Sequence, residues 1–291
     1  MQSNDEQDRE LKNAVFAAKA AAENTARSPQ QSSPLDLEVP VEVVPLPSKG
    51  LVYSEDSPLF NQETIDIKAM TAKEENILMS RALVRKGTVI TELLRSCLMD
   101  KRIDVDSMLS GDRNAIMVAI RITGYGSDYT TKVTCPGCDQ TLDFTFDLSA
   151  LPIRELDTTK VKQIKFGENL FEFTLPMSKK VVEFRFLTGK DEALILATIE
   201  GKKKRGLQND EVVTTRLTSC VVSINGETDR NQITRFVSNM RAGDSLGLRN
   251  HIDSNEPSVD MSQEFTCNNC GHQEVLSIPL GISFFWPGRS G

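Results

Sequence analysis

Four cysteines occur as two C-x-x-C pairs, and thiols at this spacing can bind a metal ion, form disulfides or carry out redox chemistry. The pairs are Cys135 with Cys138 and Cys267 with Cys270. Two intervening residues let both sulfurs of one turn reach the same ion, and four thiolates complete a closed tetrahedral zinc site. We therefore predict one structural zinc ion (Zn) held by all four cysteines, although the pairs lie far apart in the sequence.

Three other assignments of the pairs remain open from the sequence. His272 follows the second pair and could replace one thiolate, whereas Gln140 occupies the corresponding place after the first pair. A disulfide within each pair would need an oxidising particle or sample. A redox pair of the thioredoxin type needs its nucleophile at the N-terminus of a helix, and here a strand-like segment follows.

The other two cysteines, Cys97 and Cys220, lie on apolar stripes with helical spacing. The first stripe consists of Ile90, Leu93, Leu94, Cys97 and Leu98. The second consists of Val213, Leu217, Cys220 and Val221, with Arg216 in place of a leucine. Because free cysteine commonly behaves as a small buried hydrophobe, we predict that both thiols belong to the core.

The segments around the cysteines recur in the same order along the chain. TAKEENILM resembles TGKDEALIL, LLRSCLM resembles RLTSCVV, SMLSGD resembles NMRAGD, and TCPGC resembles TCNNC. Four features in one order indicate an internal duplication. We predict a first copy over residues 45–153, a connector over 154–169 and a second, divergent copy over 170–291.

Each copy carries the signals of helices followed by a β-hairpin. Thr71 with Glu74, and Thr188 with Asp191, fit the capping signature of a helix N-terminus. Beyond the first cysteine pair the apolar residues alternate with polar ones, which predicts a half-buried strand. The sequence therefore predicts an α+β fold of two tandem repeats, in which each hairpin has C-x-x-C at its turn and a zinc site joins the two tips.

The N-terminal part of the chain differs in composition from both copies. Residues 1–28 are alanine-rich, and Leu11, Val15, Ala18 and Ala22 fall on one side of an expected helix. Residues 29–44 are rich in proline and predict an extended linker. The helix is interpreted either as a loosely packed surface helix or as a docking peptide for a partner. Its acidic start does not resemble a secretory signal, so we expect a reducing compartment.

The composition argues against several classes of function. The chain has 291 residues, a formal net charge of −7 and no apolar stretch long enough to span a bilayer. The acidic balance disfavours nucleic acid and anionic membranes as partners. Only two histidines occur, and we find no phosphate-binding loop and no Ser-His-Asp pattern. We predict no enzymatic activity and no small-molecule substrate.

Two short segments can each be interpreted in two ways, as ordinary structural elements or as contact sites. The run GKKKRG, residues 201–206, is the only basic cluster, and we interpret it as a solvated loop. The C-terminal aromatic residues Phe284, Phe285 and Trp286 either close the core or anchor an interface, because large aromatic residues dominate binding energies. We favour the anchor.

One long segment resembles a known family. The string SGDRNAIMVAIRITGYGSDYTTKVTCPGC, followed by FDLSALP, resembles the baseplate proteins of T-even-type contractile-tailed bacteriophages. The matching positions are Gly111, Asp112, Arg113, Arg121, Tyr125, Gly126, Tyr129, Cys135 and Cys138. The upstream LPSKGLVY also fits, and the resemblance extends from about Pro45 to the C-terminus. The second copy departs from it where GDS and NHI replace GDR and AIR.

The resemblance implies a structural role. It implies a baseplate hub subunit, or a factor that assembles the hub, which binds other phage tail and baseplate proteins and has no catalytic activity. Such a protein would be found in the host cytoplasm during assembly and in the tail baseplate of the virion if it stays there. The alternative is a zinc-ribbon accessory protein of the phage that binds nucleic acid. Acidic residues around the cysteine pairs disfavour it, namely Asp139, Asp143, Asp147, Glu264 and Glu274.

Overall fold

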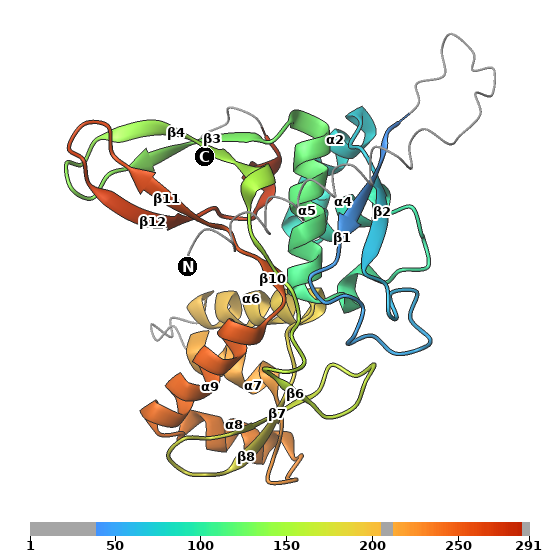
Figure 1. Cartoon of the computed structure of the whole chain (residues 1–291), viewed down its shortest axis with the longest axis vertical. Coiled ribbons are helices and arrows are strands. Elements are labelled where there is room, and N and C mark those ends of the chain that lie inside the picture. Colours follow the sequence, from blue (N-terminus) through green and yellow to red (C-terminus); the bar gives the residue numbers. More distant parts are fainter. Residues whose placement is uncertain (1–38, 205–211, 287–291) are drawn as a thin grey trace, which may run out of the picture.

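The computed structural model describes residues 39–204 and 212–286. The predicted N-terminal helix, most of the predicted linker and part of the basic run lie outside these residues. Within them the chain forms eight α-helices and several small antiparallel sheets, which confirms the α+β class. Figure 1 shows two groups of helices with a pair of β-hairpins beside them.

The first group of elements surrounds the long helix α5. In chain order it consists of β1 (Val41–Pro45), β2 (Thr64–Lys68), α2 (Ala72–Met79), α3 (Arg81–Lys86), α4 (Val89–Cys97), the 3-10 helix η1 (Val105–Ser107) and α5 (Ser110–Tyr125). Strand β1 pairs antiparallel with β2. The pairing begins at Val41, inside the segment for which the sequence predicted a linker, because that segment is also rich in β-branched valine, which favours strands.

The second group is built on a four-stranded sheet. Its elements are β6 (Lys162–Gln163), β7 (Phe171–Thr174), β8 (Val181–Phe184), α6 (Gly189–Lys204), α7 (Val212–Cys220), β9 (Val221–Ile224), α8 (Arg230–Ser238) and α9 (Ala242–Asn255). The strand order is β6-β7-β8-β9. The short strands β5 (Ile153–Arg154) and β10 (Ser258–Val259) pair where the chain leaves one group and returns from the other.

Two hairpins project from the helices. The first hairpin consists of β3 (Asp128–Thr134) and β4 (Thr141–Asp147), and follows α5 directly. The second consists of β11 (Ser262–Thr266) and β12 (Gln273–Ser277). Figure 1 shows them side by side, with their turns at the same end. Both predicted hairpins are therefore present, and each has its C-x-x-C pair at the turn.

The predicted helix caps are formed. The Thr71 side chain accepts a hydrogen bond from the first turn of α2, and the Glu74 carboxylate accepts one from the Thr71 backbone N–H at 3.0 Å. At the start of α6 the Thr188 backbone N–H donates to Asp191 at 2.9 Å, and the Asp191 N–H donates back to the threonine oxygen. These reciprocal bonds satisfy N–H groups that the helix itself leaves free.

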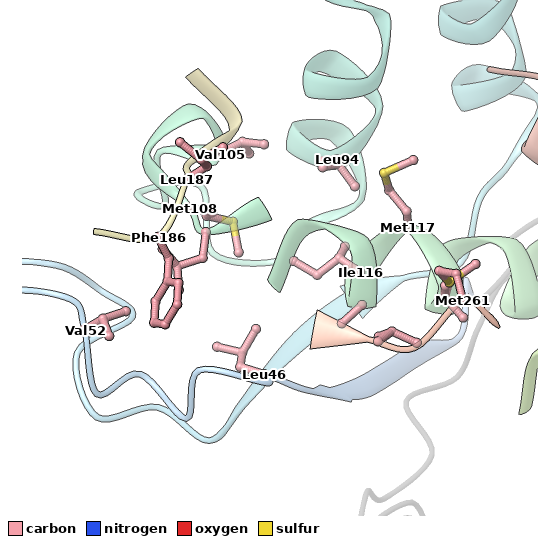
Figure 2. Close-up of a cluster of buried hydrophobic side chains, with 14 of the residues drawn as sticks. Leu46, Val52, Leu94, Val105, Met108, Ile116, Met117, Phe186, Leu187 and Met261 are labelled. Atoms are coloured by element: carbon pink, nitrogen blue, oxygen red, sulfur yellow. The ribbon is translucent and has the colours of Figure 1, made fainter. Parts of the chain in front are cut away.

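One hydrophobic core runs through both groups of elements. Figure 2 shows Phe186 and Leu187, from the segment before α6, beside Val105 and Met108 of the first group. The backbones also meet here, because the Ser110 N–H donates to the Leu187 oxygen at 2.9 Å. The two groups therefore share buried side chains.

The sequence-based core assignments are mostly confirmed. Cys97 and Cys220 are buried, and burial raises the pKa of each thiol to about 12. Val213 was assigned to the second stripe, but it is 41% exposed, so that assignment is wrong. Phe284 and Phe285 are both fully buried in the 3-10 helix η3 (Ile282–Phe285), so they close the core rather than anchor a partner.

Candidate metal centre

The two C-x-x-C turns have the same hydrogen-bond pattern. In the first turn the Cys135 N–H donates to the Gln140 oxygen at 2.9 Å, and the Asp139 N–H donates back to the Cys135 oxygen at 2.8 Å. In the second turn the Cys267 N–H donates to the His272 oxygen at 2.8 Å, and the Gly271 N–H donates to the Cys267 oxygen at 2.9 Å. Each turn thus folds its two thiols back toward one side of the hairpin.

In each turn the residue that follows the second cysteine has a left-handed backbone conformation. Asp139 has a φ of 54° and Gly271 has a φ of 72°. Glycine adopts this conformation without steric cost, and aspartate is one of the few other residues that tolerate it. The aspartate and the glycine that follow the two pairs are therefore part of the turn geometry.

The four sulfurs form one compact group. The Sγ atoms of Cys135 and Cys270 are 3.6 Å apart, and those of Cys138 and Cys267 are 3.8 Å apart. All four sulfurs lie within 4.8 Å of one another. A tetrahedral site with Zn–S bonds of about 2.3 Å has S···S separations of about 3.8 Å. The four cysteines that the sequence singled out are thus brought together in a geometry that could hold a metal ion.

Polar groups of the turns favour the thiolate form of two of the four cysteines. The backbone N–H of Cys270 lowers the pKa of the Cys267 thiol to about 7. The Asn269 side-chain amide, whose nitrogen lies 3.5 Å from the Cys138 sulfur, lowers the pKa of that thiol. Metal binding requires deprotonated cysteine, so these donors stabilise the form that binds.

A small apolar cluster supports the site from the side of the hairpins. Cys135, Cys267 and Phe265 are buried, whereas Cys138 is half-buried and Cys270 is exposed. The Phe265 ring stands edge-on to the Phe144 ring at a centroid distance of 5.2 Å. Four thiolates occupy every position of a tetrahedral ion, so the donor set fits a closed structural site and leaves no position for a substrate.

The geometry disfavours the three other assignments of the cysteine pairs, namely a histidine ligand, disulfides and a redox pair. His272 does not belong to the cluster, since its ring packs over Gly137 and its Nε2 atom lies 3.9 Å from Glu274. The S···S separations exceed the disulfide bond length of about 2.05 Å, and all six cysteines are free. Strand β4 follows the first pair, so that pair does not begin a helix.

Sequence reasoning attached no structural role to two buried charged residues of α5, Asp112 and Arg121. The Asp112 carboxylate, on α5, accepts hydrogen bonds from the Ser48 N–H at 2.9 Å, the Ser48 hydroxyl at 2.6 Å and the Tyr53 hydroxyl. Arg121 is 2% exposed and donates to the backbone oxygens of Gly126 and Asp128. Arg121 thereby fixes the start of the first hairpin on α5.

The family-like string therefore consists largely of architectural residues. A side chain at Gly111 would meet the Pro257 backbone oxygen at 1.8 Å, so only glycine permits the contact between α5 and the segment before β10. The Tyr125 and Tyr129 rings lie 5.3 and 5.9 Å from the Arg121 guanidinium carbon. The signal that could have revealed these contacts was the string itself, because glycine, aspartate and arginine on a helix with buried apolar neighbours require special partners.

The family model described as T4 bacteriophage base plate protein matches residues 45–286. A search of curated proteins found no significant match, and neither did a search of solved structures. Among the helices of the described ranges, none is long and apolar enough to cross a membrane.

Proposed function

The chain belongs to the T4 bacteriophage base plate protein family, and we propose that it is a subunit or assembly factor of the baseplate hub of a contractile phage tail. The observation that carries this proposal is the family match, which covers most of the chain. Membership suggests a structural role in the baseplate and contacts with other phage structural proteins. The finer assignment to the hub rests on the resemblance of the string around α5.

Zinc is the metal that we propose for the cysteine cluster. Soft thiolate ligands select zinc over the harder divalent ions, and a four-thiolate set is typical of structural zinc. Cys135 and Cys138 would hold the ion from the first hairpin, and Cys267 and Cys270 from the second. Zinc would then cross-link two segments that are distant in the sequence and hold the two hairpin tips together.

A tandem duplication is part of the proposal, and matching contacts support it. Asp112 on α5 accepts a backbone N–H from Ser48, in the turn after β1. Asp244 on α9 accepts backbone N–H groups from Met177 and Ser178, in the turn after β7. The two turns have the related sequences LPSK and LPMSK.

A second pair of contacts recurs between the halves. The Lys68 ammonium contacts Glu74 at 2.8 Å across the start of α2, and the Arg185 guanidinium contacts Asp191 at 2.6 Å across the start of α6. The surfaces around these shared contacts have diverged. Unlike surfaces on one subunit favour heterologous contacts with two different neighbours.

Nucleic-acid binding is the alternative function, and the charge around the cluster disfavours it. Asp139 and Asp143 of the first hairpin, and Glu264 and Glu274 of the second, are all exposed. Exposed carboxylates repel a phosphate backbone. We propose that the protein is found in the host cytoplasm while tails assemble, and in the tail baseplate where it remains in the particle.

Complementation of a phage that lacks the gene tests the proposed function. Cells infected with the deletion phage should contain heads and unassembled tail parts but few complete baseplates, and the wild-type gene should restore tails. Cys267→Ser should fail to restore them, whereas Cys97→Ala, a matched cysteine variant outside the cluster, should succeed. Normal tails from the deletion phage would contradict the assembly role. Normal tails from Cys267→Ser would contradict the need for the metal.

A further inference from the structure

Helix α6 exposes apolar side chains on the side that faces away from the core. Its central residues Leu194, Ile195 and Leu196 follow one another, so they point in three directions about 100° apart. Ile195 is 3% exposed, whereas Leu194 and Leu196 are 63% and 60% exposed. Ala193 and Ala197, which lie between the two leucines on the outer face, are exposed as well. A helix that is apolar on every side is normally buried, so a further element is needed to cover this face.

The corresponding face of α2 has a different character. The segment TAKEENILM, which contains α2, resembles TGKDEALIL at the start of α6. In α2 the polar Asn76 stands in the place of Ala193, and Ile77, in the place of Leu194, packs against the core. Helix α2 also ends about two turns earlier than α6, so it lacks the continuous apolar face of α6.

Two exposed charged residues flank this face at equal distances from its centre. Lys190 lies five residues before Ile195 and Glu200 five residues after it, so each charge is about 7.5 Å from the centre along the helix axis. By the helical period both residues lie on the same side as the alanines. The charges of this face are therefore complementary to those of a second copy in the opposite direction. We define the α6 surface by six residues, namely Lys190, Ala193, Leu194, Leu196, Ala197 and Glu200.

An antiparallel arrangement of two α6 helices suits both the charges and the alanines. Lys190 of each copy then lies level with Glu200 of the other, whereas a parallel arrangement would place like charges beside each other. Antiparallel packing also brings the positive N-terminal end of each helix dipole beside the negative C-terminal end of the other. Small alanines at the contact allow the helix axes to approach to the lower end of the usual range of roughly 8 to 10 Å.

We propose that two copies of the chain form a dimer through their α6 surfaces, packed antiparallel about a two-fold axis level with Ile195. The interface is isologous, since the same residues contribute from both copies, and it closes without forming a fibre. One helix face per copy covers less than the roughly 800 Å² per partner of a standard interface, so we expect a weak dimer with a micromolar dissociation constant. This inference does not depend on the baseplate role.

Sedimentation of the full-length protein over a concentration series tests the dimer. Lys190→Glu and Glu200→Lys should each raise the dissociation constant about tenfold, because each change sets like charges against one another at two places. Both changes complement the helix dipole, so neither should disturb folding. The two substitutions together restore opposite charges across the interface and should return the dissociation constant to within about threefold of the wild-type value.

The matched control is Lys73→Glu, because Lys73 occupies the corresponding exposed place in α2 and its replacement changes the net charge equally. The dissociation constant should be unchanged in this variant. Protein that stays monomeric at every concentration, or single variants that associate as tightly as the wild type, would overturn the proposal. It would also be overturned if Lys73→Glu weakened association as much as Lys190→Glu, or if the double variant failed to recover.

Cross-linking with a carbodiimide locates the contact, because this reagent joins an amine only to a carboxylate that touches it. Lys190 and Glu200 of one chain are separated by about 15 Å along the helix, so a link between them has to join two copies. We expect this link in the dimeric species of the wild type and not in the monomeric species. A dimer that forms without the link would contradict the α6 interface.

Discussion

The main core and the hairpin tips are held together by different means. The core buries large side chains from both groups of helices, including Phe171, Phe184 and Phe186. At the tips only Cys135, Phe265 and Cys267 are buried. The first hairpin also buries Tyr129 and Phe146 in the main core, but its tip and that of the second hairpin have only this small cluster. We therefore expect a metal ion bound by the four thiols to supply much of the stability of the tips, where little hydrophobic packing is present.

The same residue type behaves differently in the two regions. Cys97 lies in the core, where burial raises the pKa of its thiol to about 12. Cys267 lies at a tip, where a backbone N–H lowers the pKa of its thiol to about 7. The His272 N–H also lowers the pKa of the neighbouring Cys270 thiol, but desolvation and the adjacent cysteine sulfurs outweigh it and raise that pKa to about 12. Burial among carbon atoms favours the neutral thiol, whereas a donor in a tight turn favours the thiolate. Cysteine therefore acts as a hydrophobe in one region and as a candidate metal ligand in the other.

Loss of the metal should have the largest effect and should be confined to the tips. Structural zinc contributes on the order of 10 kcal/mol in small domains, and most of this would be lost in Cys267→Ser. We expect less than half an equivalent of zinc and rapid amide exchange in β3, β4, β11 and β12, with slow exchange retained in α4 and α5. Metal analysis and hydrogen exchange measure these outcomes.

The control for this experiment is Cys97→Ala, which should keep its full zinc content and slow exchange at the tips. Chelation of the wild-type protein should reproduce the effect of Cys267→Ser. Protected tips in a protein shown to be free of metal would mean that apolar packing suffices there, and the comparison between the two regions would fail.

Removal of the Asp112 carboxylate should have the next largest effect, and in the core rather than at the tips. Asp112→Ala leaves the Ser48 N–H, the Ser48 hydroxyl and the Tyr53 hydroxyl without their acceptor. Unpaired buried donors of this kind should lower the free energy of unfolding by about 3 to 5 kcal/mol. Denaturant unfolding measures the loss. Tyr53→Phe removes one donor to Asp112 and also leaves the buried Leu109 N–H without its acceptor, so it should cost about 2 kcal/mol. Equal losses in the two variants would argue against a shared acceptor.

The local patterns in the sequence were sufficient to predict that the four cysteines cluster and that each pair lies at the turn of a hairpin. The C-x-x-C pairs, the helix caps at Thr71 and Thr188 and the alternation after Cys138 are all short-range signals, and each has the expected structure. The Asp112 contacts link residues that are 64 positions apart, so no local period reveals them. The burial of Phe285 was not predicted either. The sequence signal of a single aromatic residue is the same whether its side chain packs in the core or at an interface.

Glu256 provides a smaller, pH-dependent effect at the junction of the second helical group with β10. Burial raises the pKa of this carboxyl from 4.5 to about 7, and the nearby Arg216 opposes the shift. A raised folded-state pKa adds stability that is complete below pH 4.5 and is lost as the pH rises through 7. Glu256→Gln should therefore raise the free energy of unfolding at pH 8 by about 3 kcal/mol. At pH 4 the variant and the wild type should agree. Equal stability at both values would contradict the shift.

Replacement of a core cysteine should have the smallest effect on stability. It also allows the same chemical change to be compared in the core and at a hairpin tip. Cys220→Ala keeps an apolar side chain at a buried position and leaves a cavity the size of one sulfur, so the free energy of unfolding should fall by only about 1 kcal/mol. Zinc content and exchange at the tips should be unchanged, because Cys220 ends α7 and belongs to the main core. Thermal unfolding with metal analysis measures both quantities. Cys267→Ala makes the same chemical change at a tip and should release the metal. If the two alanine variants lost equal stability and kept equal zinc, the cysteines at the tips would be ordinary packing residues, and the distinction between the two regions would disappear.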